Sequence, residues 1–90
     1  MARPQVQVGD FAKIVRIDKY DPFFKYEKQI INEATIRVNH LDHDQKDGPY
    51  PIVSGIVVLR DIPLNGDILE KGGHICLKAL LRKVEPSNLP

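Results

Sequence analysis

Residues 8–38, VGDFAKIVRIDKYDPFFKYEKQIINEATIRV, decide the fold class of this 90-residue chain. β-Branched and aromatic side chains predict a strand over Phe11–Ile17. Alternation of apolar with polar residues predicts a second strand over Ala34–Val38. Between the two strands we expect an aromatic loop over Asp18–Gln29, in which Pro22 can begin a helical turn over Pro22–Tyr26. A tight turn is expected at Ile30–Glu33. The stretch is typical of an all-β protein.

The first predicted strand has apolar residues on both faces. In a regular strand Ala12 and Ile14 share one face, and Val15 and Ile17 share the other face with Lys13. Strands of small barrels are strongly bent and curve around the core. We therefore expect a bent strand that is partly buried on both sides.

A third strand is predicted over Ile52–Leu59, after a polar hairpin connection over residues 39–51. Gly55, in the middle of this strand, indicates a bulge or a barrel corner. Asn65-Gly66 further along predicts a tight turn. Before the first strand, Val6 and Val8 alternate with glutamines, so we expect either a short edge strand or a lead-in that packs both valines inward.

The C-terminal part is predicted to close the fold. We expect a fourth strand over His74–Leu77, a one-turn helix over Lys78–Leu80 and a closing strand over Leu81–Val84. The two ends of the chain, residues 1–5 and 86–90, are expected to be flexible tails.

The length of the chain suits a single domain over residues 1–90, with its core at about residues 6–85. The composition, 42% hydrophobic and 28% charged, is that of an ordinary globular domain. No apolar run approaches the roughly 20 residues that cross a bilayer. The first residues lack the apolar segment of a secretory signal. We therefore expect a cytoplasmic protein with no membrane partner.

Thirteen basic and twelve acidic side chains give a net charge of +1. This balance argues against a protein whose affinity comes from wholesale neutralisation of phosphates, but it leaves room for a local basic patch. The one cysteine, Cys76, lies between two apolar residues, which predicts an inert thiol near the core. His74 would share its strand face, but no third group that could orient a nucleophile is readable.

The order of these signals resembles that of the SH3-like small barrels. The resemblance covers about residues 8 to 85 and is carried by Val8-Gly9-Asp10, by Ile30–Glu33 and by Ala79–Val84. Within that group the chain is similar to KOW-type domains and to short uncharacterised bacterial and phage proteins. The resemblance implies an all-β, SH3-like small barrel of about five strands with a long aromatic loop and a one-turn helix before the last strand.

Such families usually carry glycine where this chain has Asn32. Asparagine holds the left-handed turn conformation at modest cost, so we expect Asn32 to adopt it. Barrels of this type serve many unrelated roles, and the function must therefore come from a site rather than from the fold.

Two groups of residues invite a catalytic or metal hypothesis. Residues 40–44, HLDHD, offer four possible ligands, but structural zinc sites usually add ligands from elsewhere, and His74 and Cys76 are the remaining candidates. The simpler interpretation is a solvated hairpin tip. Ser54 and Ser87 do not lie in a nucleophile-elbow pattern. We therefore expect no metal, no cofactor and no enzymatic activity.

The aromatic loop holds four of the six aromatic residues of the chain. Two interpretations stay open. Phe23 and Phe24 could plug an open end of the barrel, or Tyr20 and Tyr26, with one phenylalanine, could stay exposed and contact a partner. The candidate partner-binding residues are Tyr20, Phe23, Phe24, Lys25, Tyr26, Lys28 and Arg37.

Two functions follow from this site. The first is a non-catalytic protein-interaction module, an adaptor or regulator, since the corresponding loop of SH3-like domains is often part of the binding surface. The alternative is an RNA- or DNA-binding KOW-like domain involved in transcription or translation. In that alternative the aromatic rings stack on bases while Arg16, Lys19, Lys25, Lys28 and Arg37 meet phosphates.

Nearby carboxylates favour the first function. Asp18, Asp21 and Glu27 lie among the basic residues of the loop and dilute the local positive field. Self-association through an isolated strand edge is a further expectation.

Overall fold

The computed structural model describes residues 6–43 and 49–89. It confirms an all-β protein, because the described elements are mostly antiparallel strands with one short α-helix. In chain order the elements are β1 (Phe11–Ile17), the 3-10 helix η1 (Pro22–Tyr26), α1 (Glu27–Glu33), β2 (Thr35–Asp42), β3 (Ile52–Val58), β4 (Ile62–Leu64), β5 (Asp67–Leu69), β6 (His74–Val84) and the 3-10 helix η2 (Pro86–Asn88). None of the described helices has the length and apolar character that crossing a membrane requires.

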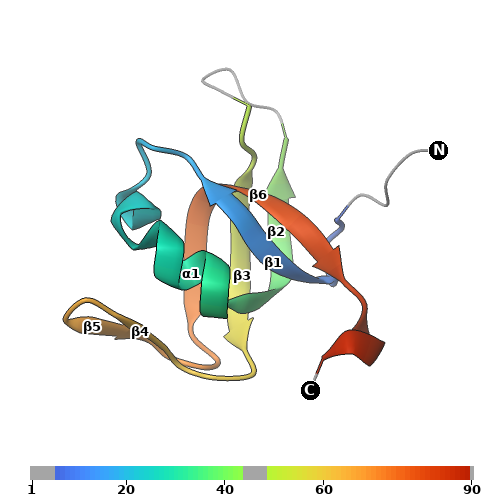
Figure 1. Cartoon of the computed structure of the whole chain (residues 1–90). Coiled ribbons are helices and arrows are strands. Elements are labelled where there is room, and N and C mark those ends of the chain that lie inside the picture. Colours follow the sequence, from blue (N-terminus) through green and yellow to red (C-terminus); the bar gives the residue numbers. More distant parts are fainter. Residues whose placement is uncertain (1–5, 44–48, 90) are drawn as a thin grey trace.

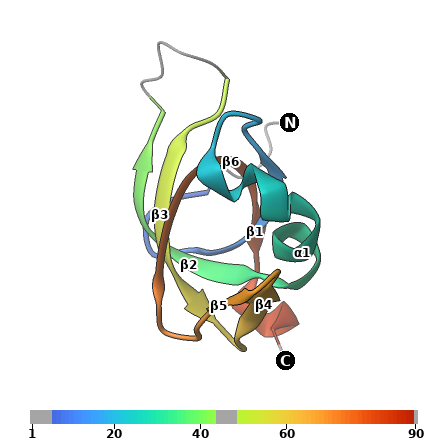
Figure 2. The same cartoon turned by 90° about the vertical axis from the view of Figure 1, so that its left-hand side faces the viewer.

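The strands β1, β2, β3 and β6 pair in a closed antiparallel ring, here called the closed sheet, because β6 pairs with both β3 and β1. The helix α1 lies beside β1 (Figure 1). The hairpin of β4 and β5 lies at one end of the closed sheet, and β2 finishes and β3 begins at the opposite end (Figures 1 and 2). Two sets of loops therefore gather at opposite ends of the molecule.

The strand β1 has the predicted bounds, but it is not buried on both sides. Its register with β6 shifts between Ile14 and Arg16. This bulge inserts an extra residue, so that Ile17 lies in the core together with Ile14 while Val15 and Arg16 are exposed. The doubled apolar pattern thus reflects a bulge rather than two buried faces.

The tight turn predicted at Ile30–Glu33 is wrong, because these residues end the helix α1. Glutamate, lysine and glutamine are good helix formers, and they bring Ile30 into the core, where it is fully buried. Asn32 therefore has helical geometry, and the expected left-handed conformation is also wrong. The helix is anchored to β1, since the Glu27 carboxylate accepts a hydrogen bond from the backbone N–H of Ile17 (2.8 Å).

The 3-10 helix η1 confirms the helical turn that Pro22 predicted within the aromatic loop. Pro22 occupies the first turn of η1, where its missing N–H costs nothing. Asp21 caps the helix, accepting a hydrogen bond from the backbone N–H of Phe23 (2.8 Å). The expected loop is therefore largely helical.

The strand β2 is longer than predicted, since it continues to Asp42, whereas β3 begins at Ile52 as predicted. Gly55 lies opposite a register shift between Val38 and His40, which confirms the expected irregularity. A Cβ atom at Gly55 would lie 2.9 Å from the carbonyl oxygen of Arg37. Glycine is thus required here by the close approach of the neighbouring strand.

The strand β6 is continuous over eleven residues, so the predicted one-turn helix at Lys78–Leu80 is wrong. These residues have fair helix propensity, but each side of β6 has a partner: Ala79 pairs with Ile17 and Lys78 pairs with Ile52. Pairing on both sides outweighs local propensity.

The hairpin of β4 and β5 was not predicted, although its turn was. Asn65-Gly66 joins the two strands, and Gly66 has a positive φ of 86°. Ile62 and Leu64 are buried in the core, whereas Pro63 and Ile68, which pair with each other, face outward. The hairpin therefore lies beneath α1, near the lower end of the closed sheet in Figure 1.

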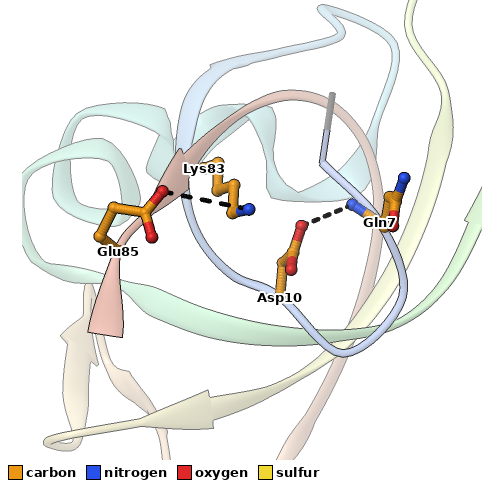
Figure 3. A network of polar contacts seen from close by, with 4 residues as sticks. All are labelled: Gln7, Asp10, Lys83 and Glu85. Carbon is orange, nitrogen blue, oxygen red and sulfur yellow. Dashed lines mark hydrogen bonds and ion pairs between the residues drawn. The ribbon is translucent and has the colours of Figure 1, made fainter. Parts of the chain in front are cut away.

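The lead-in segment confirms the Gly-Asp turn. Gly9 has a positive φ of 97°, and the Asp10 carboxylate accepts a hydrogen bond from the backbone N–H of Gln7 (2.9 Å; Figure 3). Val6 packs against the core as expected, but Val8 is 63% exposed, so only one valine faces inward.

The C-terminal segment continues beyond β6. Glu85 lies 4.0 Å from the Lys83 ammonium, also shown in Figure 3. The helix η2 follows directly, where the sequence predicted no element. Residues 1–5 and 90 lie outside the described residues.

Candidate functional site

The four aromatic residues of the loop divide into two pairs. Tyr20 is 84% exposed and Phe24 is 41% exposed. Phe23 and Tyr26 are partly buried and pack against the core. Neither interpretation holds as a whole. Phe23 and Tyr26 pack inward, whereas Phe24 and Tyr20 are exposed.

Hydrogen bonds to the backbone of Lys78 attach the segment that carries these rings to β6. The backbone N–H of Asp18 donates to the carbonyl oxygen of Lys78 (3.0 Å), and the backbone N–H of Lys78 donates to the Asp21 carboxylate (2.9 Å). The Asp18 carboxylate in turn accepts from the backbone N–H of Tyr20 (2.9 Å). These contacts place Tyr20 and Phe24 on a segment that is tied to the closed sheet at two points.

An open pocket of about 430 Å³ lies at this end of the molecule. Its aromatic walls are Tyr20, Phe24 and Tyr50, the last of which comes from the segment just before β3. Its lining residues are Arg16, Ile17, Asp18, Lys19, Tyr20, Phe24, Glu27, Pro49 and Tyr50. Rings from two separate parts of the chain therefore meet at one concave surface.

Tyr50 is the site residue that sequence reasoning missed. It lies between Pro49 and Pro51 in a segment that was interpreted as a polar connection. The carbonyl oxygen of Pro51 accepts a hydrogen bond from the backbone N–H of Ala79 (3.1 Å), which ties this segment to β6 as well. The sequence signal that could have identified Tyr50 is its position between two prolines in the predicted hairpin connection.

The charges that line the pocket are balanced. Arg16 and Lys19 contribute two positive charges, and Asp18 and Glu27 contribute two carboxylates. Both carboxylates accept hydrogen bonds from backbone N–H groups, so they serve as anchors of the segment as well as charges. The Lys19 ammonium lies 5.1 Å from the centre of the Tyr20 ring, within the range of a cation–π contact.

The other predicted site residues lie elsewhere. Phe23 and Tyr26 pack on the core, and the Lys25 ammonium lies 5.1 Å from the centre of the Tyr26 ring. Lys28 is exposed on α1. Arg37 is exposed on β2, where it pairs with Phe11 of β1 and Ile56 of β3, outside the pocket lining. The structure thus brings together Tyr20 and Phe24 of the predicted set.

The expected burial of Cys76 is wrong. Cys76 is exposed, because alternate residues of β6, beginning with His74, face outward. In the segment considered for metal binding, His40 and Asp42 belong to β2, and Asp44 lies outside the described residues. Residues 6–43 and 49–89 contain no group of three or more His, Cys, Asp or Glu side chains that could hold a metal ion.

Comparisons with protein-family models, with curated proteins and with solved structures found no match to this chain.

Proposed function

We propose that this protein is a non-catalytic interaction module that holds a segment of a partner protein in the pocket formed by Tyr20, Phe24 and Tyr50. One observation carries the proposal: the exposed rings of Tyr20 and Phe24 and the partly buried ring of Tyr50, which comes from a separate chain segment, line one open pocket. Exposed large aromatic side chains are unfavourable in water and are enriched at the centres of interfaces. Rings held on a fixed segment lose little further entropy when they bind.

The balanced charge of the pocket favours a protein over a nucleic acid. Two cations and two carboxylates line the pocket. A site that tracks a nucleic-acid backbone needs a surplus of positive charge, whereas a protein segment can match both signs. The pocket therefore suits an apolar or aromatic side chain flanked by polar groups.

The SH3-like resemblance belongs to this proposal. It is supported by the Gly-Asp turn before β1, the bulged first strand and the return of β6 to pair with β1. Two of the expected signals, the turn at Ile30–Glu33 and the one-turn helix before the last strand, are replaced by α1 and by a continuous β6. The helix α1 and the hairpin of β4 and β5 would then be additions to such a barrel.

Selection from a random peptide display library, followed by calorimetry, tests the function. Peptides enriched on the wild-type protein should bind a Tyr20→Ala/Phe24→Ala variant at least about tenfold more weakly, since each anchor ring is worth 1 kcal/mol or more. Ile68→Ala is the matched control, because Ile68 is a comparably exposed apolar residue on β5.

Two outcomes would contradict the proposal. The selected peptides could bind the double variant and wild type equally, or oligonucleotides could bind through the same rings while no peptide is enriched. The second outcome would support the nucleic-acid alternative.

A further inference from the structure

Basic and acidic residues are unevenly distributed between the closed sheet and the rest of the chain. The four strands of the sheet carry one carboxylate, Asp42. They carry six basic residues: Lys13, Arg16, Arg37, Lys78, Arg82 and Lys83. The other eleven acidic residues lie outside these strand ranges. A net charge near zero thus conceals a strongly basic sheet.

Three of these cations lie together on the outer surface of β1 and β6. Lys13 pairs directly with Arg82, and Arg16 pairs with Leu80 next to the bulge. Val15 in the bulge is 47% exposed and Leu80 is 38% exposed. We call this surface, made of Lys13, Val15, Arg16, Leu80 and Arg82, the β1–β6 face.

The β1–β6 face is costly for a domain without a partner. Like charges directly opposite each other on antiparallel strands repel, as Lys13 and Arg82 do. The register partners of Lys13 are Thr35 and Arg82, so neither neighbouring strand offers it a carboxylate. Two aliphatic side chains are also exposed at the centre of this face. An occupant that supplies negative charge and apolar contact would remove both costs.

We infer that the β1–β6 face binds an acidic, amphipathic segment of a partner protein, whose aliphatic side chains cover Val15 and Leu80 while its carboxylates meet Lys13, Arg16 and Arg82. Aliphatic residues at the centre with cations around them follow the arrangement of protein interfaces. A nucleic acid would use the cations but has no aliphatic group to cover the centre.

Arg16 links this face to the aromatic pocket. It lines the pocket and also belongs to the β1–β6 face, so the two surfaces are adjacent. The inference therefore extends the proposed function and rests on it: one partner segment occupies the pocket and continues over the β1–β6 face. The partner is then acidic next to its anchoring apolar residue.

Fluorescence anisotropy with three labelled probes tests the inference. The probes are a peptide of repeating Glu-Leu-Glu-Ser, a matched peptide of repeating Gln-Leu-Gln-Ser, and oligo(dT). The acidic peptide should bind more tightly than the other two, and its affinity should fall as salt is raised. A Lys13→Gln/Arg82→Gln variant should bind it about tenfold more weakly, as expected for two ion pairs at a partly exposed interface.

Lys71→Gln/Arg60→Gln is the control, because it removes the same charge from exposed residues outside the closed sheet. Equal binding of the acidic peptide and its glutamine analogue would overturn the inference, as would preferred binding of oligo(dT). The Tyr20→Ala/Phe24→Ala variant separates the two proposals. If it binds the acidic peptide as wild type does while Lys13→Gln/Arg82→Gln does not, the β1–β6 face binds acidic segments but the same segment does not occupy the pocket, so the link between the two surfaces fails while the peptide selection still decides the proposed function.

Discussion

The Asp21 carboxylate accepts a hydrogen bond from the backbone N–H of Lys78, 57 positions away in the sequence, at 2.9 Å. Its second oxygen accepts from the backbone N–H of Phe23 at the start of η1. One side chain thus caps a helix and attaches that helix to β6. The position of the aromatic pocket depends on this contact, since the segment that follows carries Phe24.

Replacing Asp21 with alanine should therefore loosen the aromatic segment as well as destabilise the protein. Loss of the cap and of a partly buried acceptor predicts about 2 kcal/mol from the free energy of unfolding. Urea denaturation measures this change, and hydrogen exchange should report faster exchange at the amides of Phe23 and Lys78. Asp21→Asn keeps one acceptor oxygen and should lose less. Unchanged exchange at Lys78 in the alanine variant would contradict the predicted anchor.

Glu27 connects α1 to β1 in a comparable way, through its hydrogen bond from the Ile17 backbone N–H. Glu27→Ala leaves that partly buried amide without its acceptor and should cost about 1–2 kcal/mol. Glu27→Gln retains an oxygen and should recover most of the loss. Lys28→Ala, an exposed neighbour on the same helix, should be almost neutral. Thermal unfolding of the three variants compares them, and equal melting temperatures for the Glu27 variants would rule out the hydrogen bond as the cause.

Gly55 is the single glycine within the four strands of the closed sheet. In Gly55→Ala the new methyl group would lie 2.9 Å from the Arg37 carbonyl oxygen and close to the Ile36 side chain, so β2 and β3 must separate. We expect a loss of about 2–3 kcal/mol, typical of overpacking. Ser54→Ala, one residue earlier, should change stability by less than about 0.5 kcal/mol. Chemical denaturation measures both, and a stable Gly55→Ala variant would show that the strands can move apart at little cost.

Cys76 should react as an exposed thiol in the native protein. Because it faces outward on β6, a thiol reagent should modify it completely without denaturant, at a rate similar to that in unfolded protein. Cys76→Ser should change the free energy of unfolding by less than about 0.5 kcal/mol. A thiol that reacts only after the protein unfolds would contradict this prediction. It would support the buried position that the apolar neighbours of Cys76 suggested.

Local signals were sufficient where a segment's conformation depends on its own residues. Phe11–Ile17 was predicted with its observed bounds because β-branched residues dominate it, and Pro22 correctly indicated the start of a helical turn. The turn at Asn65-Gly66 followed from backbone preference alone. Two of the rings of the pocket, Tyr20 and Phe24, were identified from the concentration of aromatic residues in one loop.

Long-range contacts explain the predictions that failed. Lys78–Leu80 is a strand because β1 and β3 pair with it on both sides, and no residue within those three reports on such partners. Tyr50 joins Tyr20 in the pocket only because the end of β1 and the start of β3 both pair with β6, at Ala79 and Lys78. Cys76 was placed inward because apolar neighbours are compatible with either face of a strand, and only the register of β6 decides the face.

The amino-acid order by itself determined an all-β protein, the position of its first strand and the concentration of rings near residue 20, since these follow from backbone preference and side-chain type. The tertiary structure decided which rings are exposed, which distant tyrosine meets them and which basic residues share one face. The physical reason is that strand pairing joins residues far apart in the chain. Net charge sums over the whole chain, whereas a partner is attracted by the charges that the sheet places side by side.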